Sequence, residues 1–530
     1  MRTPILVYRS AVIAALGGFL FGFDTAVISG TVSDLKSVFS LDNWWLGFTV
    51  AFALFGTILG AATIQYPSNA WGRKPTLILL AVIYFVSAVL CACPWNFGTM
   101  TVWDWYGFLF ARFVGGIAVG GASVVSPLYT AEISPAKKRG VLVAITQFNI
   151  VFGILVAFFS NYVIAGLHLG DLGWRWMLGI EAIPAAAFFF LLFLVPESPR
   201  WLIGKGRINQ AKKVLDALGT DSGNVDKEVS IIEKALEDER QGGKERLFCH
   251  RYRFPIFLAV CMAAFNQLSG INAILYYAPT VFTIAGASEE LSMFLPVVIG
   301  FTNLVVTMAA MYAIDWFGRK KLMLVGSVGY ITSLCIVAGT FYAYAPEFNV
   351  SIANVAVSKF AKTIDNLENT LETATPETRE FLMGELDVAK QARGSAEVGL
   401  QNAKEAFAKI RGQETDGTVP MAGILIVLGG LMLFIASHAF GQGACIWVFL
   451  SEIFPNRVRA QGQAFGSSTL WVLNALVTLL FPPLLALLGA SAVFLGFASL
   501  MVLQLLWVII FMPETKQVPL EEMQKKLGIV

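Results

Sequence analysis

Three short charged motifs each occur twice in this chain, in the same order and between long apolar stretches. Their copies are Gly72-Arg73-Lys74 and Gly318-Arg319-Lys320, Glu132 with Arg139 and Glu452 with Arg459, and Pro196-Glu197 and Pro513-Glu514. The repeated order indicates an internal duplication. Paired membrane repeats are the architecture of proteins that open a central site to alternate sides of a bilayer. The sequence therefore predicts two homologous membrane halves.

The apolar stretches are long enough to cross a bilayer. The chain is 56% hydrophobic and 14% charged, which excludes an ordinary soluble domain, and runs of about 20 apolar residues recur. We predict an all-α membrane protein with two pseudo-symmetric six-helix bundles. Its twelve transmembrane helices are expected at residues 9–31, 45–66, 76–93, 104–130, 141–165, 175–195, 254–283, 291–314, 321–344, 420–450, 459–487 and 490–512.

Lys and Arg concentrate in the short loops at one side of the predicted bundles. An excess of these residues marks cytoplasmic loops, so we expect this side and both termini to face the cytoplasm, with the protein in the inner (plasma) membrane. Asp24 interrupts the first apolar run, and we expect no cleavable signal. Because the net charge of +2 is spread over loops, it indicates no nucleic-acid binding.

Composition also predicts the domain organisation. The expected order is an N-terminal bundle at 1–196, a cytoplasmic helical linker at 197–253, the first part of the C-terminal bundle at 254–344, an insertion at 345–418, the second part of that bundle at 419–516, and a short tail at 517–530. Within the linker, Gln210–Leu218 and Val229–Arg240 have the pattern of short amphipathic helices.

The insertion carries apolar residues at alternating spacings of three and four, from Val357 to Leu371 and again from Leu382 to Ile410. This spacing is typical of a coiled-coil seam, and Pro376 between the two runs is a helix-start signal. We predict an antiparallel helical hairpin outside the cytoplasm. It could be a docking site for another protein, a lid, or an ornament without a role in the function.

Three charges lie inside apolar runs of the first half: Asp24, Arg112 and Glu181. Each costs at least about 2.5–3.5 kcal/mol in the middle of a bilayer, so we expect all three to face the bundle interior. Asp24 and Arg112 are expected to pair, either as a structural ion pair or as a switch in which protonated Asp24 releases Arg112. Glu181 is grouped with them as a candidate for proton coupling, whereas His438 is expected to be a hydrogen-bonded core residue.

The repeated motifs place charges at the cytoplasmic ends of helices, where they can hold those ends together. A network of such pairs can bias a conformational equilibrium although each exposed pair is weak. Random surface charge is the alternative, and the doubled spacing argues against it. The candidate residues of this cytoplasmic gate are Arg73, Glu132, Arg139, Glu197, Arg200, Asp315, Arg319, Glu452, Arg459 and Glu514.

Uncharged amides and two tryptophans also lie in the apolar helices. Amides both donate and accept hydrogen bonds, and flat aromatic rings suit the apolar faces of a sugar ring. The set fits a neutral polyhydroxyl ligand, although any single amide could instead join two helices. Its members are Gln147, Asn266, Gln267, Asn272, Asn303, Asn474, Trp447 and Trp471.

With these motifs the chain resembles the sugar porter family of the major facilitator superfamily, in particular bacterial proton-coupled pentose and hexose symporters. The resemblance spans nearly everything except 345–418, and its motifs include Gly22-Phe-Asp24, Asp315-x-x-Gly-Arg-Lys, Pro196-Glu-Ser-Pro-Arg, Asn266-Gln-Leu-Ser-Gly-Ile-Asn272 and Ser451-Glu-Ile-Phe-Pro455. It implies that Asp24 and Arg112 couple transport to protons. It also implies sugar contacts from Gln147, Gln267, Asn272, Asn303 and Trp447.

The chain departs from the symporter pattern at several positions. Asn266 replaces the first of a usual pair of glutamines, Gln442 stands where the xylose symporter has Trp, Leu470 stands where it has Gln, and Asn69 replaces a loop Asp. We include Gln442 among the substrate-binding candidates. The changes at Asn266, Gln442 and Leu470 leave the chosen sugar open, because lost hydrogen bonds change discrimination between hydroxyls.

We expect a proton-coupled monosaccharide symporter that works by alternating access. Facilitators of the family usually carry Asn at the Asp24 position, so the resemblance favours symport. A passive uniporter with the same pocket and a membrane sugar sensor remain alternatives. The sequence has no metal cluster, nucleophile constellation or phosphate loop in a suitable context, so we expect no enzyme and no cofactor. The remaining expected partners are the bilayer and an unidentified protein at the hairpin, and we expect a monomer.

Overall fold

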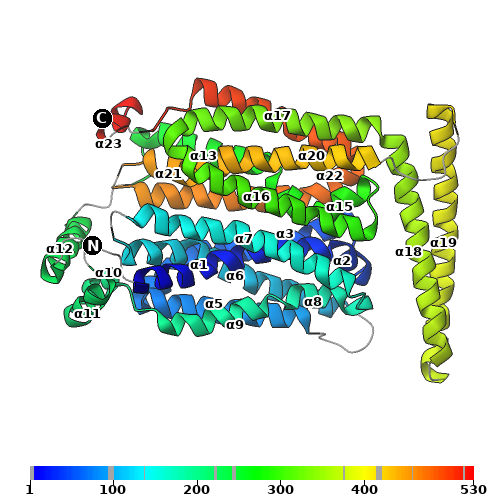
Figure 1. The fold of residues 1–530 in the computed structure, drawn as a ribbon, viewed down its shortest axis with the longest axis horizontal. Helices are drawn as coiled ribbons and strands as arrows, with labels where there is room; N and C mark the ends of the chain where they lie inside the picture. The colour runs from blue at the N-terminus through cyan, green and yellow to red at the C-terminus, as the bar shows by residue number, and fades with distance from the viewer. Residues whose placement is uncertain are drawn as a thin grey trace.

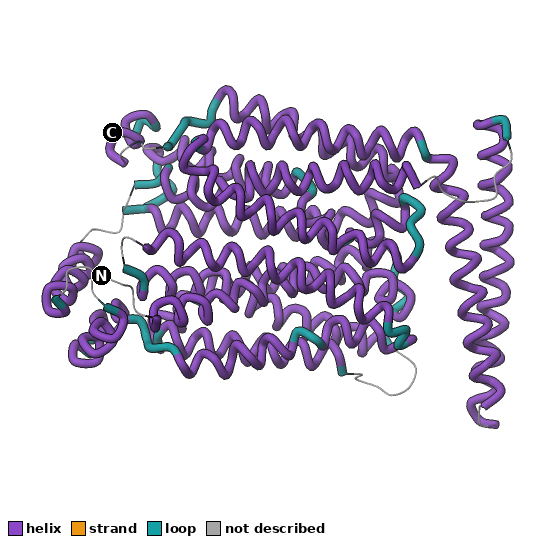
Figure 2. Tube along the Cα trace, in the orientation of Figure 1, coloured by secondary structure: helices purple, strands orange, loops and turns teal. Residues whose placement is uncertain are grey.

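The computed structural model describes residues 5–93, 101–135, 138–219, 224–241, 246–373, 376–413, 421–455, 457–516, 518 and 520–529. Every regular element within these ranges is a helix (Figure 2). The long helices run side by side in two groups, with the first half of the chain on one side and the second half on the other (Figure 1). The predicted all-α architecture is confirmed.

The first half contains the helices up to residue 194. They are α1 (Ile5–Val27), the 3-10 turn η1 (Ile28–Thr31), α2 (Val32–Val38), α3 (Asn43–Thr63), α4 (Gln65–Trp71), α5 (Arg73–Ala92), α6 (Val102–Ile133), α7 (Arg139–Gly166), η3 (Gly170–Leu172), α8 (Gly173–Gly179), α9 (Ala182–Leu191) and η4 (Leu192–Leu194).

The second half repeats this arrangement. Its elements are η5 (His250–Tyr252), α13 (Arg253–Leu268), α14 (Ile271–Tyr276), α15 (Ala278–Ile284), α16 (Glu289–Phe317), α17 (Arg319–Ala343), α20 (Met421–His438), the π-helical turn η6 (Ala439–Gly443), α21 (Ala444–Glu452) and α22 (Arg459–Ile510).

Eleven helical spans of the described chain are long and apolar enough to cross a membrane. The last of them, Gln461–Ile510, has 50 residues, whereas one crossing needs about 20. Its helix α22 is interrupted at Gly489, where φ is 79°. This span therefore supplies two crossing helices, and the twelve predicted crossings are all present.

The soluble helices lie at one end of the bundle. The linker forms α10 (Pro199–Gly204), α11 (Ile208–Leu218) and α12 (Val225–Gln241), so both predicted linker helices are confirmed. The C-terminal helix α23 (Leu520–Lys526) and the beginning of α1 lie at the same end (Figure 1).

The predicted hairpin lies at the opposite end. α18 (Ala345–Thr373) and α19 (Pro376–Arg411) run antiparallel and cross the bundle end at a steep angle to its helices (Figure 1). Ion pairs of 2.9 Å join Glu347 to Arg411 and Glu368 to Lys390, and both pairs fit one antiparallel register.

The base of the hairpin is fixed to the second half. Arg411 donates to Ala343 O over 2.6 Å, and the Phe348 ring, 2% exposed, packs against Phe341. Ser351 donates to Gly286 O over 3.3 Å. The hairpin therefore moves with the second half of the molecule.

The two halves meet most extensively along two pairs of helices. α3 packs against α22, where Gly47 lies directly against the backbone of Leu479, and α7 packs against α16, where the rings of Tyr162 and Phe294 are 5.4 Å apart. Tyr162 lies near the end of α7 and Phe294 near the start of α16, whose first residue, Glu289, pairs with Lys362 of the hairpin. The structure is a conformation closed at the hairpin end.

Candidate functional site

Asp24 and Arg112 form an ion pair inside the first half. Nη1 of Arg112 lies 2.6 Å from Oδ1 of Asp24, and Nη2 lies 3.4 Å from Oδ2. The side chain of Arg112 is 4% exposed and that of Asp24 is 8% exposed. Asp24 lies one turn before the end of α1, and Arg112 lies on the adjacent helix α6. A buried charge needs a partner of opposite sign. Arg112 of α6 is the partner that the sequence predicted for Asp24.

Glu181 joins this pair from the junction of α8 and α9. It is 4% exposed and interacts electrostatically with both Asp24 and Arg112. Its Oε1 has no hydrogen-bond partner in the described part of the chain. Two buried carboxyl groups around one guanidinium carry more potential negative charge than the site balances, which makes the cluster a place where a proton can be bound.

The amides of the seventh predicted crossing form a connected chain. Nε2 of Gln267 donates to Oδ1 of Asn266 over 2.9 Å, and Nδ2 of Asn272 donates to Oε1 of Gln267 over 2.8 Å. Gly270, with φ 86°, lies between the end of α13 and the start of α14, and this left-handed residue turns Asn272 back toward Gln267. The structure therefore brings together the three amides that the sequence grouped.

Trp471 and Asn474 present two buried donors on α22. Their side chains are 4% and 1% exposed. Among the described residues, Nε1 of Trp471 and Nδ2 of Asn474 have no acceptor. Buried polar groups are almost always hydrogen-bonded, so these two donors suit an oxygen atom of a bound ligand.

A small cavity connects this region to the ion pair. It has a volume of about 10 Å³, space for one water molecule. Its lining includes Asp24, Thr25 and Arg112 from the first half and Tyr276 and Trp471 from the second. The sequence analysis missed Tyr276 as a site residue, although its place one helical turn after Asn272 was the available signal.

The other predicted ligand contacts are more scattered. Gln147 is half-buried in α7, and Asn303 is 7% exposed in α16, where its Oδ1 accepts from Thr307 over 3.3 Å. Trp447 is 45% exposed in α21.

Gln442 lies in a different place from the other candidates. It is fully buried, and its amide binds Tyr330 and Gln504. In this conformation its hydrogen bonds connect helices within the second half, and it is not bonded to the connected amides Asn266, Gln267 and Asn272. His438 binds the Tyr330 hydroxyl over 2.5 Å, which confirms that it is a hydrogen-bonded core residue.

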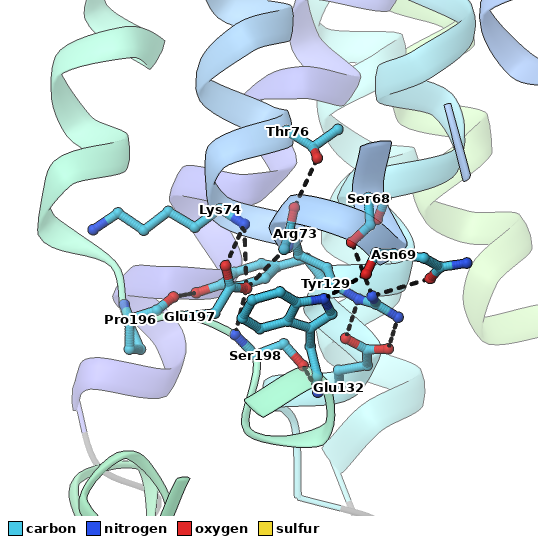
Figure 3. A network of polar contacts seen from close by, with 12 residues as sticks. Ser68, Asn69, Arg73, Lys74, Thr76, Tyr129, Glu132, Pro196, Glu197 and Ser198 are labelled. Atoms are coloured by element: carbon cyan, nitrogen blue, oxygen red, sulfur yellow. Dashed lines mark hydrogen bonds and ion pairs between the residues drawn. The ribbon is translucent and has the colours of Figure 1, made fainter. Parts of the chain in front are cut away.

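The repeated charged motifs of the first half form one network (Figure 3). Arg73 binds Glu132 with two bonds of 2.8 and 2.9 Å. Glu197 accepts from the backbone N–H groups of Arg73 and Ser198 over 3.0 and 2.7 Å. Burial raises the pKa of the Glu197 carboxyl and outweighs these bonds, which act in the opposite direction.

The second half repeats the network. Arg319 binds Glu452 over 2.9 Å, and Glu514 accepts from the backbone N–H groups of Arg319 and Lys320 over 3.0 and 3.1 Å. Each carboxylate thus caps a helix N-terminus, where the backbone N–H groups are unpaired and the helix dipole favours negative charge.

The glycine of each motif is required by this geometry. Gly72 and Gly318 have φ values of 115° and 85°. A Cβ atom would lie 2.2 Å from Glu197 Oε2 at the first and 2.6 Å from Glu514 Oε2 at the second. Only glycine both adopts this backbone and leaves room for the carboxylate.

The remaining gate candidates differ in position. Arg200 is half-buried in α10, and Arg459 donates to Phe454 O over 3.3 Å within its own turn. The side chains of Arg139 and Asp315 lie outside the described part of the structure. The ion pairs Arg73–Glu132 and Arg319–Glu452 each join residues of one half, so each pair braces its own bundle in this conformation.

A bundle of paired repeats with buried charges in one half and amides in the other defines a membrane transporter of the major facilitator fold. The family model described as "Sugar (and other) transporter" matches residues 10–361 and 406–527. The chain therefore belongs to this family of sugar transporters, which are not enzymes. The unmatched segment between these ranges lies in the hairpin.

Relatives and solved structures agree with this assignment. The chain is 33% identical to the D-xylose-proton symporter of Escherichia coli K12, covering 98% of this chain and 95% of that one, and 31% identical to a D-xylose transporter of Levilactobacillus brevis, covering 97% and 94%. The inward open conformation of the xylose transporter XylE from E. coli matches with a TM-score of 0.73 at 30% identity, covering 98% of this chain and 99% of that one.

Proposed function

We propose that this chain is a proton-coupled monosaccharide symporter that takes up a pentose or hexose by alternating access. The observation that carries the proposal is the buried ion pair of Asp24 and Arg112 beside a cavity shared with Tyr276 and Trp471. A charge change at Asp24 is felt there by groups of both halves. The E. coli relative is itself a D-xylose-proton symporter.

In the proposed cycle, Asp24 takes up a proton from the extracytoplasmic side and loses its charge. Arg112 then loses its ionic partner, and Glu181 becomes the remaining carboxyl group near its guanidinium. Opposite charges stabilise each other's ionised forms, so release of the proton restores the pair. The two halves rock between these states with the sugar bound between them.

The proposed sugar site is built mainly from the second half. Gln267, Asn272 and Asn474 supply hydrogen-bonding groups, and Trp471 and Trp447 supply aromatic surface, with Gln147, Asn266 and Asn303 completing the set. Uncharged amides suit hydroxyl groups, each of which both donates and accepts. Tyr276 lies between this site and Asp24 and is added to the proposal.

The cytoplasmic networks would stabilise the inner ends of each half during rocking. The remaining parts of the proposal are a monomer in the plasma membrane, with α1, the linker helices and α23 on the cytoplasmic side. The hairpin then lies outside the cytoplasm, where a protein partner could reach it.

Proton movement driven by sugar tests the proposal. Purified protein is reconstituted in vesicles without an ion gradient, sugar is added outside, and the external pH is recorded for a panel of pentoses, hexoses and polyols. Symport predicts external alkalinisation with the transported sugars, and an uncoupler should abolish it. Saturable uptake without a pH change would identify a passive uniporter, and binding without uptake would identify a sensor.

A further inference from the structure

The chain of α20, η6 and α21 contains a π-helical turn at Ala439–Gly443, directly before the helix that carries Trp447. A π turn holds one residue more than an α turn. Since each residue of an α-helix advances about 100° around the axis, the residues after the turn point about 100° away from where a regular helix would place them. The direction of Trp447 therefore depends on this turn.

Hydrogen bonds of one defined direction hold the turn. The Ser327 hydroxyl donates to Met323 O over 2.7 Å, so it accepts from Gln504 Nε2 over 3.0 Å. Gln504 Oε1 is then the acceptor for Gln442 Nε2, over 2.7 Å. This leaves Gln442 Oε1 as the acceptor for the Tyr330 hydroxyl, over 3.1 Å.

The hydrogen bond between Tyr330 and His438 also has one direction. Because the single hydroxyl proton of Tyr330 is donated to Gln442, the Tyr330 oxygen accepts from Nδ1–H of His438 over 2.5 Å. Ser327, Tyr330, Gln442 and Gln504 are all 0% exposed. These hydrogen bonds join three helical segments, α17, the π turn and the last part of α22, and they involve both the nitrogen and the oxygen of the Gln442 amide.

Glycine packing presses the turn against α17. A Cβ atom at Gly441 would lie 3.0 Å from the Cα of Gly326, so the two backbones are in direct contact. Small residues permit such close approach between membrane helices. The turn is therefore held by the backbone contact of Gly441 with α17 and by the hydrogen bonds of the Gln442 amide to α17 and α22.

We infer that Ser327, Tyr330, Gln442, Gln504 and His438 form a brace that positions Trp447 and thereby sets the affinity and selectivity for sugar. The inference rests on the proposed function, in which Trp447 contacts the sugar. Gln442 is a positioning residue in this scheme: it acts through the π turn and does not touch the ligand.

The test measures KM and maximal rate of sugar uptake in vesicles for Gln442→Leu and Tyr330→Phe. Each variant removes bonds from the brace, and hydrogen bonds between membrane helices correspond to about 3- to 15-fold in affinity. We expect KM to rise by about that factor with the maximal rate retained. Thr332→Val on α17 is the control, because Thr332 is exposed and binds only its own helix; its KM should equal that of the unaltered protein.

Tyr330→Phe keeps the test valid if Gln442→Leu fails to fold, since it removes one hydroxyl group only. A second comparison repeats Gln442→Leu in a Trp447→Ala background, with affinity measured by equilibrium sugar binding. If the brace acts through Trp447, Gln442→Leu should have no further effect there. Equal and additive effects in both backgrounds would mean that Gln442 acts independently of Trp447 and would overturn the inference.

Two other outcomes are separable. An unchanged KM in both brace variants overturns the brace and leaves sugar transport standing. Failure of the unaltered protein to bind any sugar of the panel overturns both proposals together.

Discussion

Replacing Asp24 by Asn should abolish uphill sugar accumulation while sugar exchange continues. Asn has the shape of protonated Asp, and its side-chain oxygen can still accept from Arg112 Nη1, which lies 2.6 Å from Oδ1 in the ion pair. The variant is therefore fixed in a state resembling the proton-loaded one. Exchange of internal for external sugar needs only that state, whereas net uptake must pass through the deprotonated state.

The size of the effect follows from the charge carried. One proton moving through 100 mV supplies about 2.3 kcal/mol, which corresponds to about 50-fold accumulation of sugar at one proton per sugar. Because one carboxylate forms the ion pair, we expect the unaltered protein to reach this accumulation ratio with an imposed inside-negative potential of about 100 mV. The variant should reach only equal sugar concentrations on the two sides of the membrane.

The assay is uptake of radiolabelled sugar into vesicles with a potassium diffusion potential, beside counterflow in the same vesicles. Asp42→Asn is the matched control: Asp42 caps α3 by accepting from Trp45 N, and Asn caps a helix equally well. Accumulation by Asp24→Asn to the level of the unaltered protein would refute the coupling role. Loss of both uptake and counterflow, with normal insertion, would show that Asp24 is needed for binding or folding instead.

Three further predictions follow from the contacts described. Gly72→Ala should lower the melting temperature in detergent, because the backbone there has φ 115° and the new Cβ would meet Glu197; Gly140→Ala, with open space around it, should not. Asn272→Ala should raise the sugar KM about tenfold, equivalent to ~1.4 kcal/mol, and an unchanged KM would remove Asn272 from the site. Residues 355 and 403 lie opposite each other in the register of the hairpin. Deleting 356–402 and joining the two helices there should leave uptake unchanged. Lost uptake by correctly inserted protein would assign the hairpin a role in transport.

Much of the fold follows from the sequence because lipid imposes a strong requirement. A crossing helix must satisfy its own backbone and be apolar over its length, so apolar runs reveal the helices directly. The doubled motifs likewise predicted interactions between helix ends, and the structure shows Arg73 with Glu132 and Arg319 with Glu452. Burial cost alone was enough to pair Asp24 with Arg112, since Arg9 stands at the very end of its predicted helix, whereas Arg112 lies inside an apolar run.

The position of Gln442 could not be derived in this way. Periodicity places a side chain on a helix face only while the helix keeps its period, and the π turn at 439–443 shifts the phase. The spacing of Tyr276, one helical turn after Asn272, placed it near the amides, but its contact with the first half across the cavity could not be derived from spacing along the chain.

The two halves share a scaffold but divide the chemistry. Both carry the same Gly-Arg-Lys turn and the same carboxylate cap, yet Asp24, Arg112 and Glu181 lie in the first half, whereas the connected amides and Trp471 lie in the second. Under the proposed function, a proton bound to one half must therefore change what the other half binds. Coupling of this kind requires a contact between the halves that differs between states. The small cavity between Asp24 and Tyr276 is such a place, because both the ion pair and the sugar site border it. Tyr276→Phe should consequently reduce the number of protons moved per sugar more than it reduces sugar affinity, and equal losses of both would mean that the halves communicate elsewhere.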